Sequence, residues 1–187
     1  MRPEKPFTQP QQWSDVTEIN RRQDVEALLN FVLTHAPYRD AIDPRHIGAM
    51  GHSLGGYTVL GLGGAWRSWR DPRIKSVLAL SPYAAPFAAA GKLADIQVPV
   101  MYQTGTRDIG IGPVLQKQGG YQQTPARKYL IVLRGAGHFA WTELNPEFQS
   151  TIAQYAIGFF DRELMGKPAP LLDQAGTEQV AFYQHAP

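Results

Sequence analysis

A serine flanked by two glycines is the first feature of this sequence that could do chemistry. Gly51-His52-Ser53-Leu54-Gly55 fits the pattern G-x-S-x-G and lies between an apolar run and a run of small residues. Glycines in this pattern permit a sharp turn from a strand into a helix, which leaves the serine hydroxyl exposed at the sheet edge. The helix N-terminus beside it favours developing negative charge. Alone, the pentapeptide is a weak signal, because a glycine-flanked serine is more often only a turn.

A carboxylate and a histidine follow Ser53, each just after a later apolar run. Asp108 ends the stretch Gln103-Thr104-Gly105-Thr106-Arg107-Asp108, and His138 lies in Gly135-Ala136-Gly137-His138-Phe139. A serine nucleophile needs a histidine base and an acid that orients the histidine. We therefore expect Ser53 to attack, His138 to take its proton and Asp108 to orient His138. The competing interpretation is structural: Asp108 pairs with Arg107 or caps a turn, and His138 lies in a flexible loop.

Other acids and histidines fit these roles less well. Asp71 and Asp95 precede apolar runs, which would place them at the opposite edge of a parallel sheet. We expect His52 to pack or hydrogen-bond within the serine turn. The remaining histidines begin a strand, end a helix or lie near the C-terminus, and we expect them to be structural or solvated: His46, His35 and His185.

Strands and helices that would position these residues alternate along the chain. A helix is expected over 15–35, because Asp15 and Glu18 resemble a capping box and Val25, Leu28, Leu29 and Val32 follow at helical spacing. A helix of small residues should follow Ser53 to about Trp66, and another should run from Asn145-Pro146 to Gly166. The polar connection 111–126 is helical around 114–118 at most. Short apolar runs predict buried strands over 46–50, 74–80, 98–104 and 129–133.

This alternation predicts an α/β fold, a mainly parallel sheet with helices on both faces. The length of 187 residues fits a single domain over 1–187, with an N-terminal arm over 1–14 and an extended tail over 167–187. Only 81–97 separates the second and third predicted strands, so we expect no large lid.

Composition excludes several classes of function. The net charge is +2 and no run of five like charges occurs, which argues against a nucleic-acid-binding protein. The chain has no cysteine, so it holds no disulfide and no thiolate metal site. The sequence shows neither a secretory signal nor an apolar run long enough to span a bilayer. The cellular compartment is therefore left undetermined, with the cytoplasm as the default expectation.

Around Ser53, Asp108 and His138 the sequence resembles the α/β-hydrolase family. Within it, the motifs are most similar to those of dienelactone-hydrolase-like and platelet-activating-factor-acetylhydrolase-like esterases and of cutinase-like polyester hydrolases. The resemblance covers about 15–165 and implies acyl transfer to Ser53, then hydrolysis by water that His138 activates, without a cofactor or metal. It also implies that the backbone N–H of Leu54 is one oxyanion donor.

The resemblance fails before residue 15. Family members carry further strands there, and a loop after one of them supplies the second oxyanion donor. Only 14 residues precede the first predicted helix in this sequence. Loss of one donor costs about 10² to 10³ in rate, so we expect a slow enzyme. The strand before Ser53 would also lie at a bare sheet edge, which predicts a homodimer in which a partner or the N-terminal arm covers that edge.

Three functions stay open at this point. The first is a lidless serine carboxylesterase for small, short-acyl esters, with Ile109, Phe139 and Trp141 lining its substrate pocket unless they are ordinary core residues. The second is an inactive hydrolase remnant that serves as a binding or scaffold module. The third is an acyltransferase or perhydrolase that uses the same triad.

Overall fold

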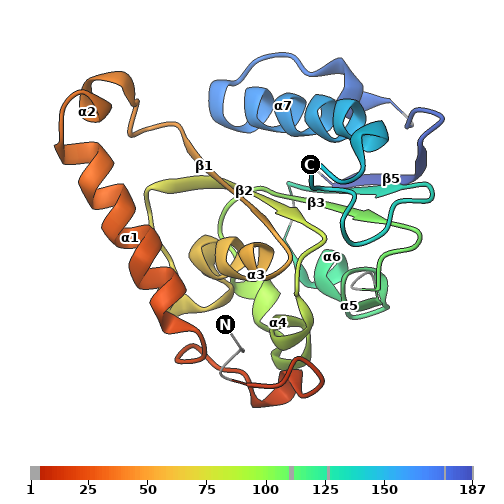
Figure 1. The fold of residues 1–187 in the computed structure, drawn as a ribbon, viewed down its shortest axis with the longest axis horizontal. Coiled ribbons are helices and arrows are strands. Elements are labelled where there is room, and N and C mark those ends of the chain that lie inside the picture. The colour runs from red at the N-terminus through yellow and green to blue at the C-terminus, as the bar shows by residue number, and fades with distance from the viewer. Residues whose placement is uncertain (1–4, 110–111, 126, 175, 187) are drawn as a thin grey trace.

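Five strands form one sheet whose spatial order follows the chain (Figure 1). The computed structural model describes residues 5–109, 112–125, 127–174 and 176–186. The first four strands pair in parallel and β5 pairs antiparallel with β4. The α/β class predicted from the sequence is therefore confirmed. The strands are β1 (Ile47–His52), β2 (Ile74–Leu80), β3 (Val100–Gly105), β4 (Lys128–Leu133) and β5 (Val180–Ala186).

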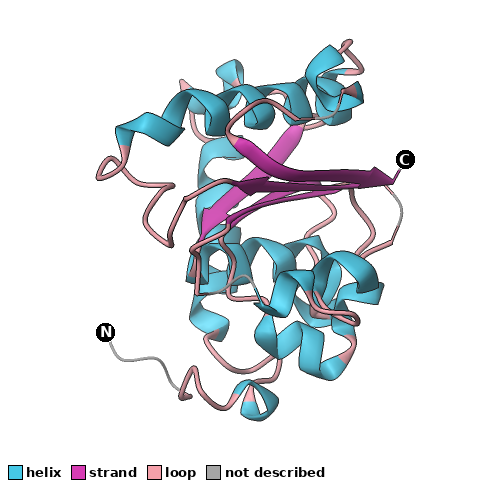
Figure 2. Cartoon of the chain, turned by 90° about the vertical axis from the view of Figure 1, so that its right-hand side faces the viewer, coloured by secondary structure: helices cyan, strands magenta, loops and turns pink. Residues whose placement is uncertain are grey.

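Helices cover both faces of the sheet (Figure 2). On one face lies α7 (Gln149–Met165), which ends at Gly166 in a left-handed conformation, as the sequence predicted. The opposite face carries α3 (Leu54–Leu60), which continues into a wider helical turn at 61–65. The other helices are α1 (Ile19–Thr34), α2 (Tyr38–Ala41), α4 (Ala85–Ala90), α5 (Gly112–Leu115) and α6 (Gly120–Gln123). None of the helices in the described ranges is long and apolar enough to cross a membrane.

Alternation along β2 shows how the sheet separates two apolar clusters. Val77 and Ala79 belong to the cluster on the α3 side, whereas Leu78 and Leu80 belong to the cluster with α7. Successive side chains of a strand point to opposite faces, so a strand covered on both sides reads as a continuous apolar run. This is why 74–80 was predicted with its observed bounds.

The first helix begins later than predicted, at Ile19, and the capping box is wrong. Glu18 occupies the N-cap position in a left-handed conformation with φ 58° and makes no side-chain cap hydrogen bond. The Asp15 carboxylate instead accepts from the Ser68 hydroxyl at 2.8 Å. The predicted apolar face is also only partly buried, because Val25 and Leu29 pack against the core while Leu28 is 59% exposed.

The predicted extended tail at 167–187 is wrong, because the chain returns to the sheet as β5. Val180 is buried against the α7 cluster, and the Tyr183 hydroxyl donates to the Leu172 carbonyl. Polar residues such as Gln184 interrupt this strand. It is half exposed at the sheet edge, so it lacks the continuous apolar run that marked the other four strands.

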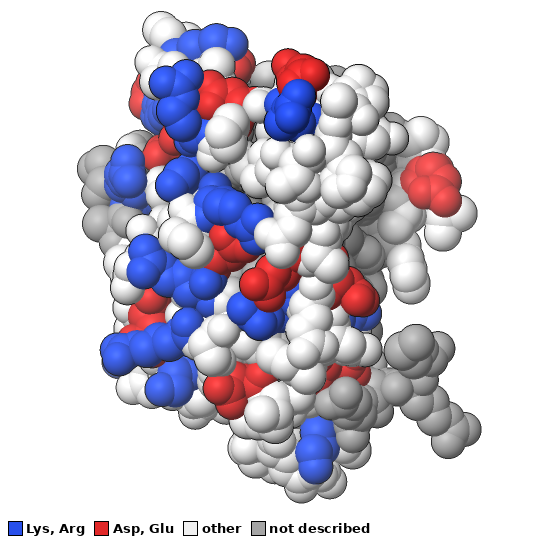
Figure 3. All heavy atoms as spheres, turned by 90° about the vertical axis from the view of Figure 1, so that its left-hand side faces the viewer, with Lys and Arg blue, Asp and Glu red and all other residues white. Residues whose placement is uncertain are grey.

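Charges of both signs alternate over the face that includes α1 (Figure 3). On and beside this helix Arg21 pairs with Glu18 at 3.5 Å and Arg22 with Glu26 at 3.0 Å. Arg73 likewise pairs with Asp71. The carboxylates beside these arginines offset their positive charge on this face.

Candidate active site

Polar residues follow the first four strands at one edge of the sheet. Ser53 follows β1, Ser81 follows β2, Asp108 lies three residues past β3 and His138 five residues past β4. Because parallel strands end at the same edge, residues more than 80 positions apart converge there.

The turn at Ser53 is strained and its shape depends on glycine. Ser53 has φ 55° and ψ −115°, an uncommon conformation for a residue with a side chain. Its N–H donates to the Leu80 carbonyl at 3.0 Å, which ties the turn to β2. A Cβ at Gly51 would lie well inside contact distance of the Gly55 carbonyl, whereas a Cβ at Gly55 would meet nothing within 4 Å. Gly51 is therefore the glycine that the turn requires sterically.

Ser53, His138 and Asp108 lie within hydrogen-bonding distance of one another in series. His138 Nε2 is 3.0 Å from Ser53 Oγ, and His138 Nδ1 is 3.1 Å from Asp108 Oδ1. The Asp108 carboxylate is buried, and it also accepts from the Thr104 hydroxyl at 2.9 Å. The structure thus brings together the three side chains that the sequence singled out.

Gly105 allows the loops that carry Asp108 and His138 to meet. A Cβ at Gly105 would overlap the Ala136 carbonyl, so the close approach of the two loops depends on glycine here. The same carbonyl accepts from the Arg107 N–H at 3.0 Å. This hydrogen bond links the loop after β3 to the loop after β4 and fixes the distance between the acid and the histidine.

Ser81 is a member of this cluster that the sequence did not reveal. Its hydroxyl donates to Asp108 Oδ2 and lies 2.8 Å from His138 Nδ1. In the sequence, Ser81-Pro82 stands only as the pair of residues that follows the second predicted strand. The signal that could have found it is position, since Ser81 is a polar residue directly after a buried strand, at the edge where Ser53 was already expected.

The His52 side chain contacts the loop that carries His138, not the serine turn to which His52 belongs. Its Nε2 lies 2.7 Å from the His138 carbonyl oxygen, which can only accept, so Nε2 carries a proton. Burial lowers the pKa of His52, which favours the neutral ring. The bond ties β1 to the backbone of His138, beyond the local packing that the sequence predicted.

A cavity of about 390 Å³ opens beside Ser53 and His138. Ile109 lines it and is 91% exposed. Phe139 is not among the lining residues; its ring is exposed and packs roughly perpendicular to that of His138. Trp141, by contrast, is buried in the core on the α7 side and donates from Nε1 to Gln103. The other lining residues are Phe7, Ser81, Pro82, Tyr83, Ala84, Ala85 and Pro113.

Phe7 is the unexpected member of this lining, because it belongs to the N-terminal arm. Its carbonyl accepts from the Tyr83 hydroxyl at 2.8 Å, and its ring contacts Tyr83 and Trp13. Burial raises the pKa of Tyr83 to about 12, so this hydroxyl stays protonated at neutral pH. The described part of the arm therefore packs beside the cavity and against α4. The sequence had offered the arm as a possible cover for the edge of the strand before Ser53, and the described part of the arm does not lie there.

The alternative acids and histidines lie elsewhere. Asp71 pairs with Arg73, and Asp95 pairs with Arg67 at 2.9 Å. His46 contacts Asp43, His35 stacks on Phe31 and His185 stacks on Tyr129. Within the described ranges, no group of three or more His, Asp or Glu side chains could hold a metal ion.

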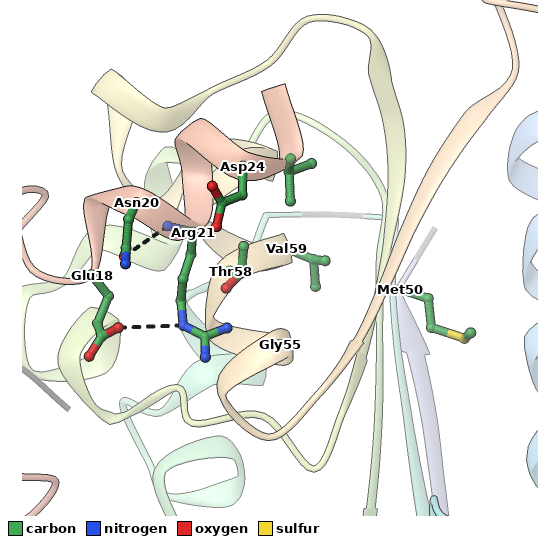
Figure 4. Close-up of a pocket in the computed structure, with 9 residues that line it drawn as sticks. Glu18, Asn20, Arg21, Asp24, Met50, Gly55, Thr58 and Val59 are labelled. Carbon is green, nitrogen blue, oxygen red and sulfur yellow. Dashed lines mark hydrogen bonds and ion pairs between the residues drawn. The ribbon is translucent and has the colours of Figure 1, made fainter. Parts of the chain in front are cut away.

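A second hollow, of about 400 Å³, lies between α1, α3 and β1 (Figure 4). Arg21 reaches across it to Glu18, and Met50 of β1 points away from the other labelled side chains. Neither Ser53 nor His138 lines it. It lies beside the outer strand of the sheet and contributes nothing to the cluster at the strand ends.

Residues 8–166 match the family described as PETase, PET hydrolase-like. The chain belongs to the PET hydrolase-like family. The match includes Ser53, Ser81, Asp108 and His138, and it ends before β5. The recognition of a cutinase-like polyester hydrolase from the sequence motifs is confirmed.

A curated relative of this PET hydrolase-like chain is Cutinase est2 from Thermobifida alba. The two are 28% identical over 147 residues, which is 76% of this chain. The chain spans 45% of the length of that relative.

Proposed function

We propose that this chain is a serine carboxylesterase that hydrolyses short-acyl esters through an acyl-enzyme on Ser53. The observation that carries the proposal is the series Ser53 Oγ, His138 Nε2, His138 Nδ1 and Asp108 Oδ1, with separations of 3.0 Å and 3.1 Å at its two ends. The strained turn that presents Ser53 supports it, because such strain persists where the structure around it is built for function. Family membership and the cutinase relative support the ester as the substrate class.

The first half of the proposed reaction forms the acyl-enzyme. Ser53 Oγ attacks the ester carbonyl carbon while its proton passes to His138 Nε2. Asp108 keeps the Nδ1–H tautomer of the histidine and stabilises the imidazolium. When the tetrahedral intermediate collapses, the C–O bond to the alcohol breaks and Nε2–H protonates the leaving alcohol.

The second half returns Ser53 to its free state. His138 Nε2 takes a proton from water, whose oxygen attacks the acyl carbon, and the bond to Ser53 Oγ breaks with return of the proton. The Leu54 N–H is the proposed oxyanion donor, since it lies at the start of α3 and no hydrogen bond to another described residue uses it. With one donor assigned, we expect turnover about 10² to 10³ below that of enzymes with two.

The cavity beside Ser53 supports a small ester. Its volume of about 390 Å³ is at the lower end of the range of small-molecule sites, and Pro82, Ala84 and Ala85 give it an apolar wall. Ile109 and Phe139 remain our proposed substrate contacts. Trp141 packs in the core and we expect it to act only through the fold.

Hydrolysis of p-nitrophenyl acetate by wild type and by Ser53→Ala, at matched concentration, tests the proposal. We expect steady hydrolysis by wild type and a loss to background in the variant, because no nucleophile remains. Equal background rates in both would favour the scaffold alternative. Product ratios with added alcohol or peroxide separate hydrolysis from acyl transfer or perhydrolysis.

We also propose a homodimer that covers the outer edge of β1. Among the described strands β1 pairs with β2 alone, and Met50 on it is 59% exposed. Light scattering at micromolar concentration should give twice the chain mass, and Met50→Lys should lower it, since lysine on an edge strand opposes pairing. Met165→Lys, at a 52% exposed position on α7, is the matched control. A wild type that stays monomeric contradicts the dimer.

A further inference from the structure

The Ser81 hydroxyl contacts both partners of the histidine–carboxylate pair. It lies 2.8 Å from His138 Nδ1, closer than the Asp108 oxygen at 3.1 Å, and it donates to the second oxygen of the Asp108 carboxylate. Ser81 is 1% exposed, so water does not compete for these bonds. Position and burial together make this hydroxyl part of the arrangement that holds the base.

The backbone at Ser81 is held in a conformation that favours glycine. Ser81 has φ 42°, and its N–H donates to the Gln103 carbonyl at 2.7 Å. A residue with a side chain at positive φ is strained, and such strain persists only where the surrounding structure enforces it. Glycine would relieve this strain but would bring no hydroxyl to Asp108 and His138. Ser81 therefore has a strained backbone but makes two polar contacts that glycine could not make.

One assignment of protons satisfies all the contacts. Ser53 Oγ–H donates to His138 Nε2, which leaves the ring proton on Nδ1. Nδ1–H then donates to both Asp108 Oδ1 and Ser81 Oγ, while Ser81 Oγ–H donates to Asp108 Oδ2. The tautomer is the one that the proposed reaction requires.

We propose that Ser81 is a positioning residue that fixes the orientation of His138 relative to Asp108 by accepting from the imidazole and donating to the carboxylate. The proposal rests on the esterase function proposed above. In the transition state His138 becomes an imidazolium, and Nδ1–H becomes a stronger donor to both acceptors. Loss of the hydroxyl should therefore lower kcat and leave KM nearly unchanged, because Ser81 acts through His138.

Two substitutions separate the hydroxyl from the backbone strain. Ser81→Ala removes the hydroxyl and keeps the φ cost, whereas Ser81→Gly removes the hydroxyl and relieves that cost. We expect both to lower kcat for p-nitrophenyl acetate by about 10- to 100-fold, the range for a hydrogen bond to a charged group. If Ser81→Gly keeps wild-type kcat, the role of Ser81 is not in its hydroxyl and the proposal is overturned.

Thr104→Val is the matched control, because the Thr104 hydroxyl donates to the same carboxylate oxygen as Ser81. In the described part of the chain that hydroxyl has Asp108 as its hydrogen-bond partner. We expect a smaller loss of kcat than in the Ser81 variants. If Thr104→Val lowers kcat as much as the Ser81 variants do, Ser81 acts only as another donor to Asp108, and the proposal is wrong.

The second readout does not depend on catalysis. The Nδ1–H proton of His138 should give a downfield NMR resonance, which Ser81→Ala and Ser81→Gly should shift because one of its two acceptors is lost. An unmoved resonance overturns the proposal. If wild type fails to hydrolyse esters, the proposed function fails on its own, and the resonance still decides whether Ser81 holds the imidazole.

Discussion

At the scale of single residues, the two glycines that flank Ser53 have different physical roles. A Cβ on Gly51 would overlap backbone atoms of Gly55, whereas a Cβ on Gly55 would enter open space. Backbone atoms cannot rotate aside as a flexible side chain does, so position 51 excludes alanine. Position 55 has room for it. The motif marks both positions in the same way, but only Gly51 is required by sterics.

This difference predicts opposite results for two alanine variants. Gly51→Ala should reduce ester hydrolysis by about 10²-fold or more, because a displacement of about 1 Å at a catalytic group costs that much. Gly55→Ala should keep activity and raise the free energy of unfolding by about 0.5 to 1 kcal/mol, since Gly55 lies in α3. Both are measured by p-nitrophenyl acetate hydrolysis and urea denaturation. Equal losses in the two variants would contradict the steric account.

At the scale of elements, the N-terminal arm forms part of the wall of the cavity beside Ser53. The Trp13 indole donates to the Pro6 carbonyl at 3.1 Å and packs on Tyr83. Phe7 contacts both rings and lines the cavity together with Tyr83. Trp13 is 4% exposed, so the described part of the arm is anchored by a core residue. The packing of the arm therefore affects the shape of this cavity, which is our proposed substrate site.

Phe7→Ala should therefore change substrate preference with little effect on chemistry. Removal of the ring widens the cavity, so we expect KM for p-nitrophenyl acetate to rise and the preference for longer acyl chains to grow. Each change should be about 2- to 10-fold, as expected for about 1 kcal/mol of apolar contact. Phe182→Ala is the control, because Phe182 is equally exposed at 48% but lies on β5. An unchanged ratio of acyl-chain preferences would remove Phe7 from the substrate site.

Strands that are buried on both faces were predictable from the sequence. Elements that are buried on one face, or that are marked only by a local motif, were not. The strand 74–80 lies between Pro72 and Pro82 and is continuously apolar from Val77 to Leu80, so its bounds could be predicted. The start of α1 could not be predicted, because Glu18 takes a left-handed conformation, which is uncommon for a residue with a side chain and which no local residue pattern indicated. Ser53, Asp108 and His138 could be found from their order. Ser81 fits no role in that order, and its place in the cluster becomes clear once β2 lies between β1 and β3.

At the scale of the whole molecule, charge pairs differ greatly in burial. The Asp71 and Arg73 side chains are 9% and 27% exposed, whereas those of Asp40 and Arg39 are 63% and 56% exposed. The hydrogen bond from the Arg73 side chain, against the opposing effect of burial, lowers the pKa of Asp71. Exposed pairs contribute little because water and salt screen them.

Asp71→Asn should destabilise the protein at neutral pH by about 1 to 3 kcal/mol, the range for a hydrogen bond to a charged group. The lowered pKa means that the folded state favours the ionised carboxylate, so this stability is present above the ordinary carboxyl pKa of about 4. It is lost as the pH falls toward the lowered value. Urea denaturation at several pH values should show the difference from wild type shrinking below about pH 4, and Asp40→Asn should change little at any pH.

The agreement between sheet order and chain order determines how the site is assembled. Each strand is hydrogen-bonded to the next one along the chain, so the sheet can grow one strand at a time as the polypeptide emerges during synthesis. Ser53, Ser81, Asp108 and His138 then arrive in that order, one from each successive strand end. We therefore expect Ser53, the proposed nucleophile, to be in place first and to remain without His138, its proposed base, until β4 has joined.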